Sequence, residues 1–371
     1  MRIVAVDCFG YELAYAHGEY VMSSGRAAVT QEGTVVRLRT DEGLTGWGEV
    51  TPLGATYLPA FAEGVRTALR FLAPELIGID PTNTRQLARL LDAHLMGHQY
   101  AKSALDIASW DLRGQALGRP ISDLLGGALQ EDFPLYEAVP LGPPEEMADF
   151  VRRRGAAGVK RFQLKVGNAP EDDIARTRAV VEVADSDTVV IADSNGGWDL
   201  MSARIAMAGL AGLPVYVEQP CRSTEDCILA ARGSALPLVL DESIVTPSDL
   251  FVAKHEAGAS SVNIKISRVG GLTSAALMRD LMQQLNLRVS IEDTWGGDII
   301  TAAVSHLAAT TRPESLLMTS FFNDWTDGHL AGHQPRSVGG RGSAPRGPGL
   351  GIEVDADRLG EPLFSVTGSV R

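Results

Sequence analysis

Residues 189–198 have the sequence VVIADSNGGW, in which an apolar run ends abruptly in Asp193 and Asn195. A short apolar run rich in β-branched residues predicts a strand that is buried on both faces, as in a parallel sheet. The two polar side chains then lie at the carboxyl end of that strand. Reactive groups gather at this end in barrels of parallel strands, so the stretch predicts both the kind of sheet and the place of a site.

Two further strands follow the same plan. Residues 215–220, VYVEQP, bring Glu218 to the end of an apolar run, and residues 238–243, LVLDES, do the same for Asp241. A helix-length segment separates each strand from the next, as a crossover between parallel strands requires. Neighbouring parallel strands end side by side, so we expect Asp193, Glu218 and Asp241 to converge. Three carboxylates repel one another unless a cation lies between them, and all-oxygen ligation favours Mg²⁺ over zinc.

Residues 127–320 alternate between strand-like and helix-like segments. Eight strands that alternate with helices predict an α/β fold, a (β/α)₈ TIM-type barrel. The expected strands are residues 135–139, 161–166, 188–193, 215–218, 238–241, 261–266, 288–291 and 315–319.

The first 126 residues have a different pattern. Residues up to about 50 alternate as antiparallel strands do, with a turn at 41–43, and the period then becomes helical up to residue 126. We therefore expect an α+β capping domain over residues 1–126. The Gly- and Pro-rich residues 321–371 have no helical period and are expected to return to this capping domain.

Two lysines complete the predicted rim. Alternation in FQLKVG turns Gln163 and Lys165 to one face of their strand, into the barrel, and VNIKI does the same for Asn263 and Lys265. The strand of Lys165 precedes the carboxylate strands and the strand of Lys265 follows them. The two amines are therefore expected to approach a metal-bound substrate from opposite faces. An amine near a divalent cation and a second amine loses proton affinity, so it can act as a base near neutral pH.

The order of these motifs resembles the enolase superfamily, in its muconate-lactonising-enzyme subgroup. The likeness covers essentially the whole chain and is carried by GWGE at 46–49, Lys165, Asp193-x-Asn195, Glu218, Asp241-Glu242 and Lys265. The resemblance implies one Mg²⁺ per active site, held by Asp193, Glu218 and Asp241. It also implies that Lys165 or Lys265 removes the proton next to a carboxylate, whose developing charge the metal absorbs.

One position departs from the subgroup, which usually has Lys-x-Lys where this chain has Gln163-x-Lys165. The missing lysine normally tunes its neighbour, so Lys165 is expected to hold its proton more tightly here than in relatives. We expect Gln163, Glu242 and Asn263 to support the ligands and lysines from behind, and Asn195 to contact the substrate.

Three other segments resemble a branch of the subgroup that acts on proline derivatives. This branch includes cis-3-hydroxy-L-proline dehydratases and hydroxyproline-betaine 2-epimerases, and the segments are IEDTWGGDI at 291–299, GHQYAK at 97–102 and TPLGATY at 51–57. A free ring ammonium favours a carboxylate, whereas a betaine nitrogen favours an aromatic cage. Asp293 and Asp324 offer the carboxylate. The resemblance therefore implies dehydration of cis-3-hydroxy-L-proline to Δ¹-pyrroline-2-carboxylate.

Two other functions remain open. A racemase or 2-epimerase of proline betaine, hydroxyproline betaine or N-acyl amino acids would use the same lysines. A non-catalytic, metal-dependent binder of small carboxylates would keep the carboxylates but has no use for opposed lysines. Trp295 and Trp325 suit packing as well as substrate contact, and Tyr57 is a further candidate contact.

Composition narrows the partners of the chain. The net charge of −13 disfavours nucleic acid, and no span approaches the roughly 18 apolar residues of a membrane helix. The three cysteines match no zinc pattern and fit a reduced compartment. We expect a cytoplasmic homo-oligomer whose partner is a small, amino-acid-like carboxylate.

Overall fold

The computed structural model describes residues 1–368. Its centre is a sheet of eight parallel strands that follow one another in chain order. These strands are β7 (Glu137–Val139), β8 (Arg161–Lys165), β9 (Val189–Asp193), β10 (Val215–Glu218), β11 (Leu238–Leu240), β12 (Ser261–Lys265), β13 (Arg288–Glu292) and β14 (Leu316–Thr319). A bridge between Leu135 and Thr319 brings the first and last strands together. The predicted barrel is confirmed, and the strands lie where the sequence places them.

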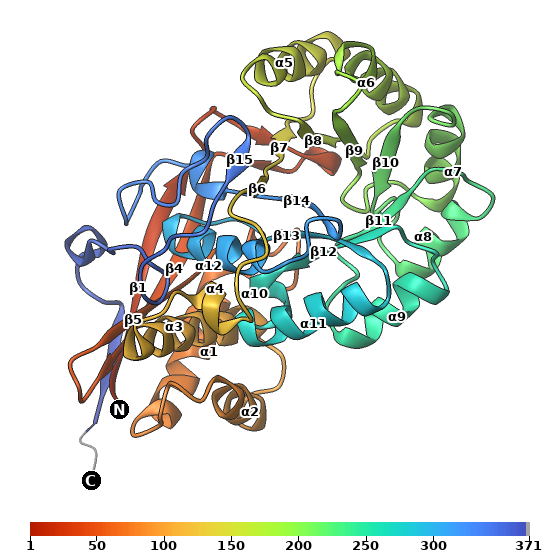
Figure 1. The fold of residues 1–371 in the computed structure, drawn as a ribbon. Coiled ribbons are helices and arrows are strands. Elements are labelled where there is room, and N and C mark those ends of the chain that lie inside the picture. Colours follow the sequence, from red (N-terminus) through yellow and green to blue (C-terminus); the bar gives the residue numbers. More distant parts are fainter. Residues whose placement is uncertain (369–371) are drawn as a thin grey trace.

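Helices cover the outside of this sheet, as Figure 1 shows. They are α5 (Pro144–Ala156), α6 (Pro170–Val183), α7 (Leu200–Gly209), α8 (Thr224–Ala231), α9 (Pro247–His255), α10 (Ile266–Val269), α11 (Leu272–Gln284) and α12 (Asp298–Ala309). The strands between them are buried on both faces, with Val190, Ile264 and Ile291 almost wholly inaccessible. A sheet that is covered on both faces explains why β9 and β11 are nearly continuous apolar runs, whereas β8 and β12 turn polar side chains into the barrel.

The amino-terminal part is an antiparallel sheet with helices on one face. The sheet has the order β16 (Phe364–Thr367), β1 (Ile3–Ala14), β4 (Thr30–Thr40), β5 (Thr45–Val50). The helices are α1 (Ala62–Leu72), α2 (Thr84–His94) and α3 (Gln99–Leu117), followed by α4 (Ile121–Leu124). Because β16 pairs antiparallel with β1, both ends of the described chain meet in this sheet (Figure 1). The exact domain boundaries remain a prediction.

Short elements complete the chain. The strands β2 (Tyr20–Val21) and β3 (Ala27–Ala28) form a small hairpin, and β6 (Phe133–Pro134) pairs with β15 (Arg341–Gly342). Single turns of 3-10 helix lie at Ser23–Gly25, Ala73–Leu76, Phe322–Asp324 and Ala356–Leu359. No helix in residues 1–368 is long and apolar enough to cross a membrane.

The segment GWGE is where the sheet meets helix α3. A Cβ atom on Gly48 would lie 1.9 Å from the carbonyl oxygen of Ala104, and one on Gly46 would lie 2.3 Å from that of Ala108. Only glycine allows β5 and α3 to pack this closely. The alternate residue Glu49 points the other way, towards the barrel, where its carboxylate meets the start of α12.

Candidate active site

Six charged side chains project from the carboxyl ends of consecutive barrel strands. Lys165, Asp193, Glu218, Lys265 and Glu292 are the last residues of β8, β9, β10, β12 and β13, and Asp241 directly follows β11. Strand register sets Lys165 beside Asp193, Asp193 beside Glu218, and Lys265 beside Glu292. The lysines are 5% and 7% exposed and the carboxylates no more than 1%. The structure thus brings together the rim that the sequence predicts.

Lys165 lies among a few close partners. Its amine donates to Asp193 Oδ2 at 2.5 Å and to Gln163 Oε1 at 2.9 Å, and it lies 5.9 Å from the ring centre of Tyr20. Burial lowers the pKa of Lys165, but the charges of Asp193, Tyr20 and Glu218 and the hydrogen bond to Asp193 together outweigh burial and raise the pKa above its ordinary value. Without a cation on Asp193, this lysine is held protonated.

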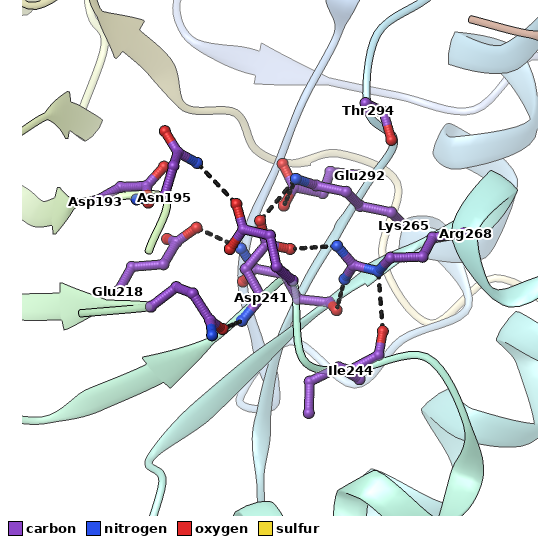
Figure 2. Close-up of polar contacts among 12 residues, drawn as sticks. Asp193, Asn195, Glu218, Asp241, Ile244, Lys265, Arg268, Glu292 and Thr294 are labelled. Carbon is purple, nitrogen blue, oxygen red and sulfur yellow. Dashed lines mark hydrogen bonds and ion pairs between the residues drawn. The ribbon is translucent and has the colours of Figure 1, made fainter. Parts of the chain in front are cut away.

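Lys265 has a more crowded surrounding. Its amine donates to Asp241 Oδ2 at 2.7 Å and to the Tyr57 hydroxyl at 3.1 Å, and Glu292 Oε1 is 4.0 Å away. Arg268 Nη1 donates to the other oxygen of Asp241, Oδ1, at 2.9 Å (Figure 2). Burial raises the pKa of Asp241, but Lys265 and Arg268 together lower it below its usual range. Burial also lowers the pKa of Lys265, but the charges of Asp241, Glu292 and Glu242 together raise it above its ordinary value.

Glu218 lies between the two lysine sides. Its carboxylate accepts hydrogen bonds from the amides of Gln163, at 3.0 and 3.2 Å, and of Asn263, at 2.8 Å. Burial, together with the charges of Asp193 and Asp241, raises the pKa of Glu218 well above its ordinary value. Neutral amides cannot offset these charges, so the centre of the rim favours a cation.

The donor set fits a hard divalent cation. Every candidate ligand is a carboxylate oxygen, as Mg²⁺ prefers. Five carboxylates face three cationic side chains, which formally leaves two negative charges in excess. The carboxylates are Asp193, Glu218, Asp241, Glu242 and Glu292, and the cations are Lys165, Lys265 and Arg268. Within residues 1–368, no three acidic, histidine or cysteine side chains are already arranged to coordinate one ion. The Lys165 amine binds one oxygen of Asp193, and the Lys265 amine binds one oxygen of Asp241.

Asn195, Glu242 and Tyr57 form a connected group over one side of the rim. Asn195 has a positive φ of 48° and donates its backbone N–H to Asp193 Oδ1 at 2.8 Å. Glu242 Oε1 accepts from the Asn195 amide at 3.0 Å and from the Tyr57 hydroxyl at 2.7 Å. Tyr57 comes from the capping part of the chain, so it connects the loop of residues 51–57 to the barrel. Its contact with the substrate stays a prediction.

The two aspartates expected to meet a ring ammonium have other partners. Asp293 accepts from the backbone and hydroxyl of Ser267, both at 2.8 Å, and from the N–H of Thr294 at 2.6 Å. Asp324 lies 2.8 Å from His333 Nε2 and lines a small cavity that includes neither lysine. Neither carboxylate is therefore free in this structure.

Trp295 and Trp325 belong to an aromatic cluster of Tyr15, Tyr20, Tyr136, Trp295, Phe322 and Trp325. The ring centre of Trp295 lies 5.3 Å from that of Tyr20 and 6.5 Å from that of Trp325. Tyr20 is the member that reaches the Lys165 amine. The two tryptophans pack behind Tyr20, and we call Tyr20, Trp295 and Trp325 the aromatic wall. Direct contact of the tryptophans with the substrate stays a prediction.

Two residues of the rim, Glu292 and Arg268, were not predicted from the sequence. Glu292 follows the same alternation that indicated Lys165, but the neighbouring Asp293 competed with it. Its Oε2 accepts from the Tyr136 hydroxyl, whereas its Oε1 accepts no hydrogen bond from any described residue. Burial raises the pKa of Glu292 to about 7. Arg268 lies on α10, a one-turn helix, and no local pattern marks it as a partner of Asp241.

Comparison with known families agrees with this geometry. The profile "Enolase C-terminal domain-like" matches residues 146–358, and "Mandelate racemase / muconate lactonizing enzyme, N-terminal domain" matches residues 16–126. The chain therefore belongs to the mandelate racemase/muconate lactonizing enzyme family of the enolase superfamily. The resemblance inferred from the motifs is confirmed.

Individual relatives cover almost the whole chain. A cis-3-hydroxy-L-proline dehydratase of Roseibium aggregatum is 44% identical over 98% of this chain and 99% of its own length. An N-succinyl-L-Arg/Lys racemase of Bacillus cereus is 28% identical over 97% and 98%. A solved enolase-superfamily member from Roseovarius nubinhibens, complexed with magnesium, has a TM-score of 0.93 at 34% identity and covers 99% of this chain and 100% of its own.

Proposed function

We propose that this protein is a Mg²⁺-dependent hydro-lyase that converts cis-3-hydroxy-L-proline to Δ¹-pyrroline-2-carboxylate. The observation that carries the proposal is the pair of buried lysines on either side of the carboxylates Asp193, Glu218 and Asp241. The 44% identity to the Roseibium dehydratase supports the choice of substrate. A binding protein would have no need of two opposed amines.

Asp193, Glu218 and Asp241 are the proposed ligands of one Mg²⁺. When bound, the ion supplies positive charge that stabilises the charge developing on the substrate carboxylate as the α-proton leaves. The resting partners of the lysines support this assignment, because Asp193 and Asp241 hold the two amines protonated. Loss of these partners to a cation lowers the proton affinity of both amines.

The lysines act from opposite sides of the ring. In cis-3-hydroxy-L-proline the hydroxyl and the carboxylate share one face, so the α-hydrogen and the hydroxyl lie on opposite faces. One amine removes the α-proton, and the other, protonated, gives a proton to the departing hydroxide, which leaves as water. The C–O bond breaks as the C2–C3 double bond forms. The resulting enamine tautomerises to the cyclic imine.

Glu292 is the proposed partner of the ring ammonium, in place of Asp293 or Asp324. It is buried next to Lys265, and its Oε1 accepts no hydrogen bond from residues 1–368. Glu292→Gln is expected to raise KM for the substrate by roughly 10- to 100-fold, because a hydrogen bond to a charged group contributes about 1.5–3 kcal/mol. Asp324→Asn is the matched comparison and is expected to change KM little. A large rise in KM for Asp324→Asn with little change for Glu292→Gln would instead assign the ring ammonium to Asp324, as the sequence suggests.

The direct test is incubation with cis-3-hydroxy-L-proline and Mg²⁺ in D₂O, in parallel with proline betaine, hydroxyproline betaine and N-acyl amino acids. We expect the imine, detected with o-aminobenzaldehyde, only from the hydroxyproline. Chelation should stop the reaction and added Mg²⁺ should restore it. If only a betaine exchanges its α-hydrogen and no imine forms, the protein is a 2-epimerase. Binding of carboxylates without turnover or exchange would favour the non-catalytic binder.

The epimerase is the second candidate because of the aromatic cluster around Trp295. Aromatic rings attract a quaternary ammonium, and Tyr20 lies close to the Lys165 amine. An epimerase would use one lysine to deprotonate the α-carbon and the other to reprotonate its opposite face. The cytoplasmic location and the homo-oligomer also remain predictions, and light scattering of the purified protein would test the oligomer.

A further inference from the structure

The carboxylate of Glu49 lies at the amino end of a barrel helix although it comes from the capping sheet. Glu49 is the last-but-one residue of β5 and is wholly buried. Its Oε1 accepts from the N–H of Gly297 at 2.5 Å and from the Tyr11 hydroxyl, and its Oε2 accepts from Ile299 and Ile300 at 3.1 and 3.0 Å. Ile299 and Ile300 belong to the first turn of α12, and Gly297 is the residue directly before it, which supplies no side-chain cap.

Two glycines make this approach possible. A Cβ atom on Gly297 would lie 2.7 Å from the Tyr11 hydroxyl oxygen and 3.3 Å from Glu49 Oε1. Gly296 has a φ of 156°, and a Cβ there would lie 2.0 Å from the side chain of Ile300. The Gly296-Gly297 pair is therefore shaped to receive a carboxylate from another part of the chain.

The helix held by Glu49 begins directly after the loop that carries Trp295. Trp295 is 1% exposed and packs on Tyr20, which reaches the Lys165 amine. The Tyr100 hydroxyl of α3 also contacts Thr294 in this loop. The loop is thus held on one side by Tyr100 and on the other by Glu49, and both come from the capping part of the chain.

We propose that Glu49 is a positioning residue, which fixes the aromatic wall beside Lys165 by capping α12 from the neighbouring domain. Its connection to turnover rests on the proposed function. The connection to the Trp295 loop does not, because it depends only on contacts within the protein.

Asp106 provides a matched control. This buried carboxylate of α3 caps α11 in the same manner, accepting from the backbone of Thr273 at 2.9 Å and from its hydroxyl at 2.6 Å. A Cβ on Gly271, the residue before α11, would lie 2.4 Å from Asp106 Oδ2. Both residues therefore anchor the capping domain to a barrel helix, but only Glu49 adjoins the Trp295 loop.

The test compares Glu49→Gln with Asp106→Asn in the full chain by hydrogen exchange of peptides that span residues 293–301 and 266–275. Loss of a helix cap corresponds to about 5- to 30-fold faster local exchange. We expect this increase at 293–301 for Glu49→Gln and at 266–275 for Asp106→Asn. We also expect KM for cis-3-hydroxy-L-proline to rise several-fold only in Glu49→Gln.

Equal exchange at 293–301 in both variants would overturn the proposal and leave Glu49 as a docking contact only. Tyr11→Phe removes one donor to Glu49 and is the milder substitute should Glu49→Gln fail to fold; unchanged exchange at 293–301 in that variant would also count against the proposal. The exchange experiment needs no substrate. It therefore still tests the role of Glu49 if the dehydratase assignment fails.

Discussion

The two sides of the rim hold their lysines in different ways. Lys165 has one carboxylate, Asp193, and a neutral amide, Gln163. Lys265 shares Asp241 with Arg268 and also meets Tyr57 and Glu292. Arg268 keeps a positive charge next to Asp241 whether or not Lys265 is protonated. The difference indicates that the pKa of Lys165 depends mainly on one carboxylate, whereas several neighbouring charges set the pKa of Lys265.

Removing the charge between the two sides should have the largest effect. Glu218→Gln is expected to lower turnover by about a thousandfold or more, because a bound metal contributes several kcal/mol of charge stabilisation. With chelator present, the variant should melt at or above the wild-type temperature. The raised pKa of Glu218 means that its ionised form is favoured less in the folded than in the unfolded chain, so the difference should widen as pH rises.

Substrate titration and thermal melts in chelator would measure both effects. Near-normal turnover of Glu218→Gln would remove Glu218 from the metal site. A lower melting temperature that is independent of pH would show that the raised pKa does not govern stability here.

Replacing each lysine separates the two sides. Lys165→Ala and Lys265→Ala are each expected to lower turnover by about 10²- to 10⁴-fold, the usual contribution of a general acid or base. The variant that keeps the base should still exchange the α-hydrogen with D₂O, which NMR of the recovered substrate would detect. Near-normal turnover in either variant would make that lysine a bystander.

A charge next to Lys165 should sharpen the contrast further. Gln163→Lys adds a positive charge beside the amine, which disfavours the protonated form and lowers the pKa of Lys165. If Lys165 is the base, the acid limb of the pH–rate profile should move down by roughly one unit, since like charges at this range shift a pKa by about that amount. Gln163→Met, which adds no charge, is the control. An unmoved limb would assign the base role to Lys265.

The smallest effect is expected at the outer edge of the Lys265 side. Tyr57→Phe removes hydrogen bonds to Glu242 and from Lys265, and should lower kcat/KM by about tenfold, the value of one charged hydrogen bond. The melting temperature should change little, since the ring itself remains. A large fall in melting temperature with an unchanged kcat/KM would make Tyr57 a structural contact.

The sequence allowed the rim to be predicted because its residues obey local rules. Each proposed ligand or lysine ends or directly follows a short buried strand, and period-two alternation decides which side chains enter the barrel. The same rule also places Glu292 on the inward face, but the adjacent Asp293 was chosen there as the candidate substrate contact. The structure separates them, because Asp293 accepts hydrogen bonds from Ser267 and Thr294, whereas one oxygen of Glu292 accepts none from residues 1–368.

The partners of residues outside the strands could not be predicted in this way. The partner of Asp324 in the structure is His333, nine residues further along an irregular segment, and the contact of Asp324 with the substrate stays a prediction. Glu49 was noticed only as part of GWGE, and its role depends on α12, about 250 residues later in the chain.

The sequence by itself thus determined the barrel, the order of its carboxylates and the inward direction of the lysines, because strand periodicity is a property of neighbouring residues. Only the tertiary structure decided which carboxylate beside Lys265 keeps an oxygen without a hydrogen bond from residues 1–368, which arginine shares Asp241, and which residues of the capping part hold α11 and α12. Those contacts join segments far apart in the chain, and their geometry follows from how the two parts pack and not from any local pattern.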